Sequence, residues 1–198
     1  MQKLFISGRP VNPGVEARPA HRVLLLFSIL VFSFCVSLLY MGMRDVMRLG
    51  GFVASGGPYQ IAHEAPGWVW IFPVSVFLIL GSMFASFFAG SKVAGPNLMS
   101  LSWSALFMAL GWNFVEFGFG TGTGGGLVWG WVVCAALFML MGGIPLLIIV
   151  ASFLKSLEER RTRRTDDGGQ SWGISLLLQS AAAAGGVLLG LYFFRILV

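Results

Sequence analysis

Residues 23–43 read VLLLFSILVFSFCVSLLYMGM, a run that contains no charged side chain. Because a helix rises 1.5 Å per residue, a run of this length crosses the roughly 30 Å hydrocarbon core of a bilayer. A cleaved signal sequence has an apolar region of only about 7–15 residues, followed by a small-residue cleavage site. This run is longer, and Arg44 and Asp45 follow it directly. It therefore predicts a transmembrane helix that is retained in the protein.

Further apolar runs of spanning length follow along the 198-residue chain. None of them alternates polar and apolar residues over the length of a strand, so a membrane β-barrel is not expected. We therefore predict an all-α fold, a polytopic integral membrane bundle of five transmembrane helices. The predicted spans are 23–43, 68–90, 98–117, 128–154 and 174–197.

The composition supports a membrane protein. Apolar residues make up 57% of the chain and charged residues 11%, against about 45–50% and 25% in soluble domains. So few polar side chains cannot cover a soluble globule, whereas a bilayer leaves apolar surface in a favourable environment. The net charge of +5 comes from bases beside the apolar runs and not on a face that reads nucleic acid. The lipid bilayer is the expected partner, and no nucleic acid is.

The placement of lysine and arginine predicts the orientation. These residues accumulate in cytoplasmic loops, and tryptophan prefers the membrane boundary. With the N-terminus in the cytoplasm, ten of the 13 bases lie inside and three outside, and five of the seven tryptophans lie at outer ends. Five spans then put the C-terminus outside. The expected segments are a cytoplasmic tail 1–22, a membrane domain 23–197, external loops 44–67 and 118–127, and a basic cytoplasmic loop 155–173.

Two stripes of small residues are candidates for helix packing. Lipid is as apolar as leucine, so membrane helices associate where small residues allow their backbones to approach. Packing within the bundle is one interpretation of the stripes, and contact with another subunit or a second copy is the other. The stripes are Gly81, Ala85 and Ala89 in the second span, and Ala182, Gly186 and Gly190 in the fifth.

Glu116 is the one acidic residue within a predicted span. It lies 18 residues after Leu98, roughly 27 Å along a helix, which places it near the outer boundary. Asn113 lies one turn earlier on the same face. An acid in a membrane span is a candidate for a substrate or proton site. The alternative is a solvated carboxylate or a structural ion pair, with Arg44, Arg48 or Arg195 as the possible cation.

No catalytic or metal-binding pattern stands out. No Ser/His/Asp order or carboxylate pair stands out, there is no Cys/His cluster, and no histidine lies within a span where it could ligate haem. Cys35 and Cys134 lie in apolar runs, where cysteines behave as small hydrophobes. The sequence therefore predicts no catalytic residue, metal or cofactor, and an enzyme is the weaker functional class.

Two glycine-rich segments follow the first and third spans, GGFVASGGPYQIAHEAP at 50–66 and FGFGTGTGGG at 117–126. Both are external in the predicted topology. Glycine-rich backbone near Arg44 and Arg48 could hold an anion, but no phosphate-loop pattern is present. Tight turning over the bundle is the simpler interpretation. The residues expected to shape the first loop are Gly50, Gly51, Gly56, Gly57 and Pro58.

The first loop resembles that of a group of small bacterial multi-span membrane proteins, many of them actinobacterial, whose loop has the form GGxCASGGPYxIxxxCP. The resemblance implies a plasma-membrane protein and no known reaction. It also implies a disulfide in the group, whose two positions are Val53 and Ala65 here, so other contacts such as those of Phe52 and Tyr59 must hold this loop. The matching residues are Gly50, Gly51, Ala54, Ser55, Gly56, Gly57, Pro58, Tyr59, Ile61 and Pro66.

Three functional hypotheses follow. The first is a non-enzymatic membrane protein that acts through its ordered external loop, with Tyr59 as a candidate contact, as a subunit or partner of a membrane assembly. The second is a translocator of a small solute or ion that uses Glu116 and Asn113. The third and weakest is a membrane enzyme that acts on lipid headgroups.

Overall fold

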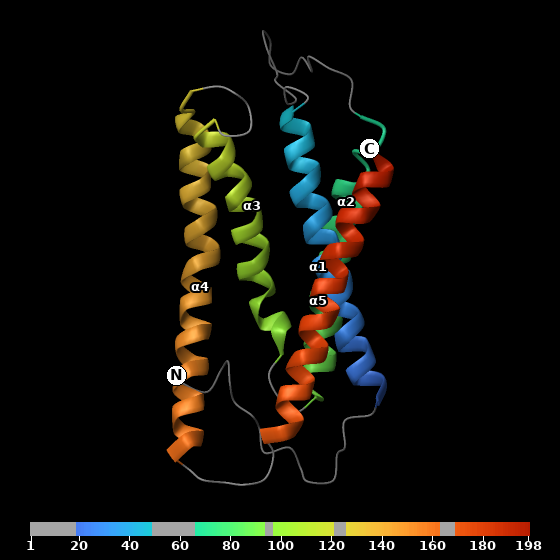
Figure 1. Cartoon of the computed structure of the whole chain (residues 1–198), viewed down its shortest axis with the longest axis vertical. Coiled ribbons are helices and arrows are strands. Elements are labelled where there is room, and N and C mark those ends of the chain that lie inside the picture. The colour runs from blue at the N-terminus through green and yellow to red at the C-terminus, as the bar shows by residue number, and fades with distance from the viewer. Residues whose placement is uncertain (1–18, 49–65, 94–96, 121–125, 163–168) are drawn as a thin grey trace.

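The protein is described from a computed structural model, which covers residues 19–48, 66–93, 97–120, 126–162 and 169–198. All regular structure in these ranges is helical (Figure 1). Within the described residues, five helical segments are long and apolar enough to cross a membrane, as predicted, and one of them combines a short 3₁₀ helix with α3. The elements are α1 (Pro19–Arg48), α2 (Ile71–Gly90), η1 (Leu98–Leu101), α3 (Ser102–Gly118), α4 (Trp129–Thr162) and α5 (Gly169–Leu197).

Several helices continue past the predicted membrane boundaries. Helix α1 runs on to Arg48 and α4 to Thr162, because the backbone hydrogen bonds of a helix do not require a hydrocarbon environment to continue. The predicted cytoplasmic loop 155–173 is therefore partly helical, since α4 occupies its beginning and α5 starts at Gly169.

The helices form two parts that meet along one line of contact. Helices α2 and α5 both pack on α1, and these three are called the trio below. Helices α3 and α4 pack along each other and are called the hairpin. The hairpin meets the trio where α3 lies on α1, with a smaller contact between η1 and α5. Figure 1 shows the hairpin standing beside the trio.

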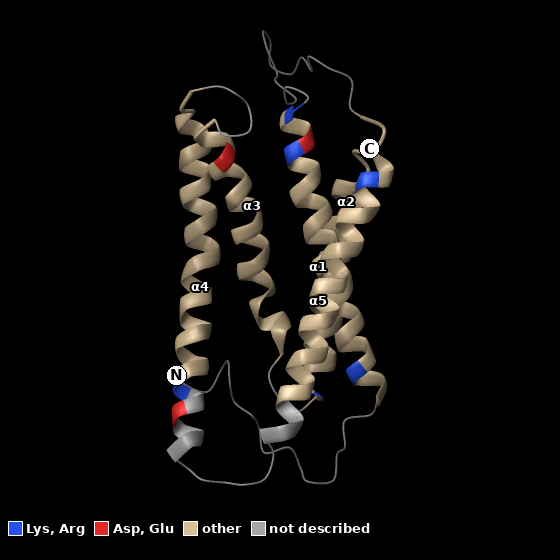
Figure 2. Cartoon of the chain, in the orientation of Figure 1, with Lys and Arg blue, Asp and Glu red and all other residues tan. Residues whose placement is uncertain are grey.

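Charged residues gather at the two ends of the bundle (Figure 2). One end holds the end of α1 and the end of α3, which the Arg44–Glu116 ion pair joins, together with the C-terminus, and is called the tip end. The other holds the end of α2 and the start of η1, and is called the base end. Which end faces the cytoplasm stays a prediction from the lysine and arginine count.

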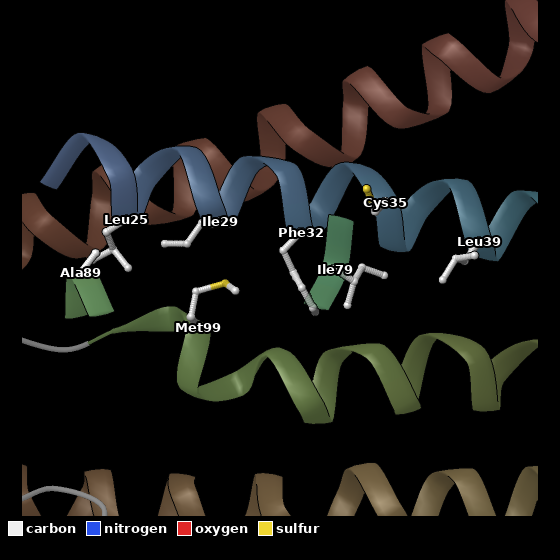
Figure 3. Packing of buried hydrophobic residues seen from close by; sticks show 8 residues of the cluster. All are labelled: Leu25, Ile29, Phe32, Cys35, Leu39, Ile79, Ala89 and Met99. Carbon is white, nitrogen blue, oxygen red and sulfur yellow. The ribbon is translucent and has the colours of Figure 1, made fainter. Parts of the chain in front are cut away.

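The trio is built on a stripe of α1 that faces its neighbours. Leu25, Ile29, Phe32, Cys35 and Leu39 recur every three or four residues along α1 and are buried. That spacing puts them on one face of the helix. Figure 3 shows this face turned toward α2 and toward η1. Its partners in the cluster are Ile79, Ala89 and Met99.

The stripe of the fifth span packs on α1, as one of the two interpretations expected. A Cβ added at Gly186 would collide with the main-chain oxygen of Leu30. A Cβ at Gly190 would lie 2.7 Å from the main-chain oxygen of Phe34 and would collide with Ser37. Glycine at these two positions thus allows the backbones of α1 and α5 to come into direct contact.

The stripe of the second span behaves differently. Ala89 is buried, but Gly81 is exposed, and a Cβ added there would meet no atom of the described residues within 4 Å. Intramolecular packing is therefore not found at Gly81. The face of α2 that lies on α1 is instead carried by Ser82 and Ser86, whose hydroxyls donate to the main-chain oxygens of Ile79 and Met83. These hydroxyls need no partner on α1 because their own helix satisfies them.

Glycines also bring the two helices of the hairpin together. Gly118 of α3 lies against Val132, and Gly111 against Phe138 and Met139. From the other side, a Cβ at Gly142 of α4 would lie 3.0 Å from the main-chain oxygen of Ser104. Aromatic rings fill the seam between these contacts; they are Phe107, Phe114, Phe117, Trp131 and Phe138. The hairpin is thus a closely packed unit in its own right.

Candidate functional site

Glu116 lies at the tip end, where α3 meets α1. Its Oε2 is 3.0 Å from a guanidinium nitrogen of Arg44, the residue one helical turn beyond Tyr40 on α1. The side chains of Arg44 and Glu116 are 31% and 20% exposed. Since water reaches both groups, the pair contributes at most about 1 kcal/mol to stability. Of the three arginines considered as partners for Glu116, the structure pairs it with Arg44.

Each charged group of this pair also has a partner in its own helix. The Arg44 guanidinium donates to the Tyr40 hydroxyl at 2.8 Å and lies over the Tyr40 ring, 5.5 Å from its centroid. The Trp112 indole N–H donates to Glu116 Oε1 at 2.9 Å. Both contacts join residues four apart, which share a helix face. The pair is therefore supported from α1 and from α3 separately.

Asn113 forms a second link between the same two helices. Its side chain is fully buried, and its Nδ2 donates to the main-chain oxygen of Tyr40 at 3.0 Å. Its Oδ1 has no hydrogen-bond partner among the described residues. A buried amide oxygen without a partner is costly, so it marks a point where a water or ligand group would be favourable.

A separate polar contact ties α5 to the base of the hairpin. Gln179 is buried, and its Oε1 accepts a hydrogen bond from the Leu98 main-chain N–H at 2.8 Å. Its Nε2 donates to Ser175 Oγ at 3.1 Å. The first N–H groups of a helix have no partner within it, so Gln179 supplies the acceptor that η1 lacks. Asn97 caps the next position by accepting from Met99 N–H.

The other predicted site residues are not brought to Glu116. Arg48 is exposed at the end of α1, and Arg195 is exposed near the end of α5. Tyr59 and the loop-shaping Gly50, Gly51, Gly56, Gly57 and Pro58 lie outside the described residues, as do Val53 and Ala65. The structure therefore describes the residues on both sides of the first loop and not the loop itself.

Two residues of the polar contacts were not singled out from the sequence. Tyr40 could have been found because it lies one turn before Arg44 in an otherwise apolar helix, where a phenol can hold a guanidinium. Gln179 could have been found as the one amide within the fifth predicted span, because polar groups in hydrocarbon need a partner.

A small apolar cavity of about 100 Å³ lies away from this site, between α1, α2 and α5. Among the side chains that line it are Phe34, Trp70, Val74 and Phe193. It has almost no polar lining and does not reach Glu116, so it offers neither a catalytic group nor a path for a solute to the ion pair.

The described residues contain no group of three or more His, Cys, Asp or Glu side chains that could hold a metal ion. What the tip-end residues can do is bind one helix to another, through one ion pair and several hydrogen bonds. No protein-family model matches the chain, and comparison with curated proteins and with solved structures finds no similar protein.

Proposed function

We propose that this integral membrane protein is a non-enzymatic subunit of a membrane assembly, and that it binds its partner through the loop of residues 49–65. One observation carries the proposal: buried or paired side chains fix the chain on both sides of that loop. On the α1 side, Arg44 is paired with Glu116, and α1 ends four residues later at Arg48.

The α2 side of the loop is fixed by Trp68. Its side chain is 8% exposed, and its ring lies 5.4 Å from the Phe194 ring and 6.1 Å from the Phe72 ring. Leu38 and Ile71 belong to the same buried cluster. A tryptophan packed in this way sets where the chain re-enters the bundle, because its large ring has few alternative positions.

The second glycine-rich connection, between α3 and α4, is closed by a hydrogen bond between its two ends. The Val128 main-chain N–H donates to the Gly118 oxygen at 2.9 Å, and Gly120 takes a φ of 68°, a conformation that glycine adopts without strain. Fixed residues on both sides of a loop favour binding, because less conformational entropy is lost when a partner docks. These features support a recognition surface at the tip end.

The orientation belongs to the proposal as well. The excess of lysine and arginine on one side favours a cytoplasmic N-terminus and an external tip end. The loop sequence supports a bacterial plasma membrane of the actinobacterial type, through its resemblance to the group described above. With Val53 and Ala65 in place of the group's cysteines, the fixed residues on either side of the loop and the contacts expected of Phe52 and Tyr59 would take over the role of the disulfide.

The partner is tested by affinity purification of the tagged full chain in a mild detergent. We expect a second membrane protein to co-purify at fixed stoichiometry, and to be lost from Tyr59→Ala because a loop contact is removed. Leu147→Ala, at a position 70% exposed on α4, is the matched control and should retain it. Purification without a stoichiometric partner, or equal retention by both variants, contradicts the proposal.

The second candidate, ion translocation, is favoured by the unpartnered Oδ1 of buried Asn113 beside the Glu116 pair. If Glu116 carries protons, Glu116→Gln should abolish proton flux into proteoliposomes, measured with an enclosed pH dye under a potassium diffusion potential. Arg195→Gln, which also removes one exposed charge, should leave the flux unchanged. Equal flux in wild type and Glu116→Gln excludes this role for the carboxylate.

A further inference from the structure

The chain enters and leaves the hairpin at the same end of the bundle. It reaches η1 and α3 from α2 through residues 91–97, and it passes from α4 to α5 through residues 163–168. The described helix ends that these connections join, at the end of α2, the start of η1, the end of α4 and the start of α5, lie at the base end (Figure 1). At the tip end, α3 and α4 are connected covalently only to each other, so non-covalent contacts alone hold the hairpin tip to the trio.

Those contacts are concentrated on α1. The ion pair between Arg44 and Glu116 and the bond from Asn113 to the Tyr40 oxygen join α3 to α1 near the tip. Helix α4 packs on α3 and η1 and makes no comparable contact with another described helix. At the base end, the Gln179 bond to Leu98 adds a second attachment beside the covalent ones.

From this arrangement we propose that the Arg44–Glu116 pair is a latch, and that its release lets the hairpin tip swing away from α1 while the base stays in place. The hairpin moves as one unit, since glycine contacts and aromatic rings pack α3 against α4 along their length. The trio stays intact because Gly186 and Gly190 hold α5 on α1. The latch goes beyond the proposed partner binding and does not depend on it.

The contacts around the pair favour a latch over a permanent joint. When the helices separate, Arg44 keeps Tyr40 and Glu116 keeps Trp112, because each of these contacts lies within one helix. Neither charge is left without a hydrogen-bond partner, and both already reach water. The Asn113 Oδ1, which has no partner among the described residues, would gain water on opening. Opening thus breaks the hydrogen bond from Asn113 Nδ2 to the Tyr40 oxygen, but it lets water bond Asn113 Oδ1, which has no described partner while the helices are in contact.

The proposal is tested by electron–electron distance measurements between spin labels in lipid nanodiscs. Cys35→Ala and Cys134→Ala remove the native thiols. The tip pair is Arg48→Cys with Trp129→Cys, which joins α1 to α4. The base pair is Arg22→Cys with Lys155→Cys, and the pair within the trio is Arg48→Cys with Arg195→Cys. The five positions that carry a spin label are all exposed.

In the Glu116→Gln background we expect the tip distance to shift to longer values and to broaden, while the base and trio distances stay as in wild type. Arg44→Gln should act in the same way, and Arg195→Gln, measured with the tip and base pairs, should have no effect. Raising the salt concentration from 0.1 M to 1 M on the chain with Glu116 and Arg44 intact should also broaden the tip distance, because salt screens exposed charges.

Two results would overturn the latch. The first is a tip distance that stays unchanged in Glu116→Gln, in Arg44→Gln and in high salt, which would show a fixed joint. The second is a base or trio distance that changes as much as the tip distance, which would show general loosening of the bundle. The trio distance also reports whether each variant has folded, so a misfolded variant is recognised and the salt measurement then decides.

Discussion

Gly186→Ala is expected to destabilise the protein by about 1–3 kcal/mol, although it adds a single methyl group. The added Cβ would collide with the Leu30 main-chain oxygen and lie 3.0 Å from Ser33 Cβ. A backbone oxygen cannot move aside as a side chain can, so α5 must shift away from α1. The measurement is equilibrium unfolding in mixed micelles with increasing sodium dodecyl sulfate, followed by tryptophan fluorescence.

The neighbouring glycine provides the control. A Cβ added at Gly185 would meet no atom of the described residues within 4 Å. Because alanine favours helix over glycine by up to about 1 kcal/mol, Gly185→Ala should be neutral or slightly stabilising. Opposite signs for the two adjacent substitutions would establish the close contact between α1 and α5. If both variants unfold like wild type, the backbones of these helices do not touch at Gly186.

Gln179→Leu is expected to cost about 1–3 kcal/mol, because it removes the acceptor of the Leu98 N–H and leaves that donor unpaired in apolar surroundings. Leucine fills a similar volume, so the effect reports the hydrogen bond and not a cavity. Unfolding in mixed micelles measures the free energy. Hydrogen exchange of residues 97–101 measures the local effect, and we expect faster exchange at the start of η1.

Ser175→Ala separates the two bonds of Gln179. It removes only the acceptor of Gln179 Nε2 and keeps the bond to Leu98, so its cost should be about 0.6 kcal/mol, the average for such bonds between membrane residues. Exchange near Leu98 should stay slow in this variant. A Gln179→Leu variant as stable as Ser175→Ala, with slow exchange at η1, would show that Gln179 does not anchor the hairpin base.

The spans could be predicted from the sequence because hydrocarbon imposes one requirement on every residue of a span. Each backbone polar group must be bonded internally, and long apolar runs meet that requirement as helices. The ends of the helices could not be placed in the same way. Past the boundary water can satisfy the backbone equally well. The helix-forming residues KSLEERR after the fourth predicted span allow α4 to extend, but they do not fix its end at Thr162.

The packing faces were only partly predictable. The stripe that contains Gly186 and Gly190 and the stripe that contains Gly81 have the same spacing. Of these three glycines, only Gly186 and Gly190 pack against another described helix. The spacing defines a stripe on a helix, but the helix it meets depends on tertiary arrangement. On α2, Ser82 and Ser86 form an equally narrow face one residue away, and that face is the one that meets α1.

The partner of Glu116 shows a similar limit. Its position near the membrane boundary followed from its distance along the helix. The sequence did not distinguish Arg44, Arg48 and Arg195 as its possible partner. The choice of Arg44 depends on α3 lying against α1 and not against α5, which no local pattern encodes.

The pairing of α1 with α5 has a consequence for how the protein is made. Helix α1 is synthesised before α5, and it can pack on Gly186 and Gly190 only after the intervening helices α2, α3 and α4 have been made. Until then, the α1 surface around Leu30, Phe34 and Ser37 must remain against lipid or the insertion machinery. The hairpin, whose two helices are consecutive, can assemble earlier. Packing of the trio therefore waits for the synthesis of α5, and a truncation before Gly169 would leave α1 without the helix that Gly186 and Gly190 bring against it.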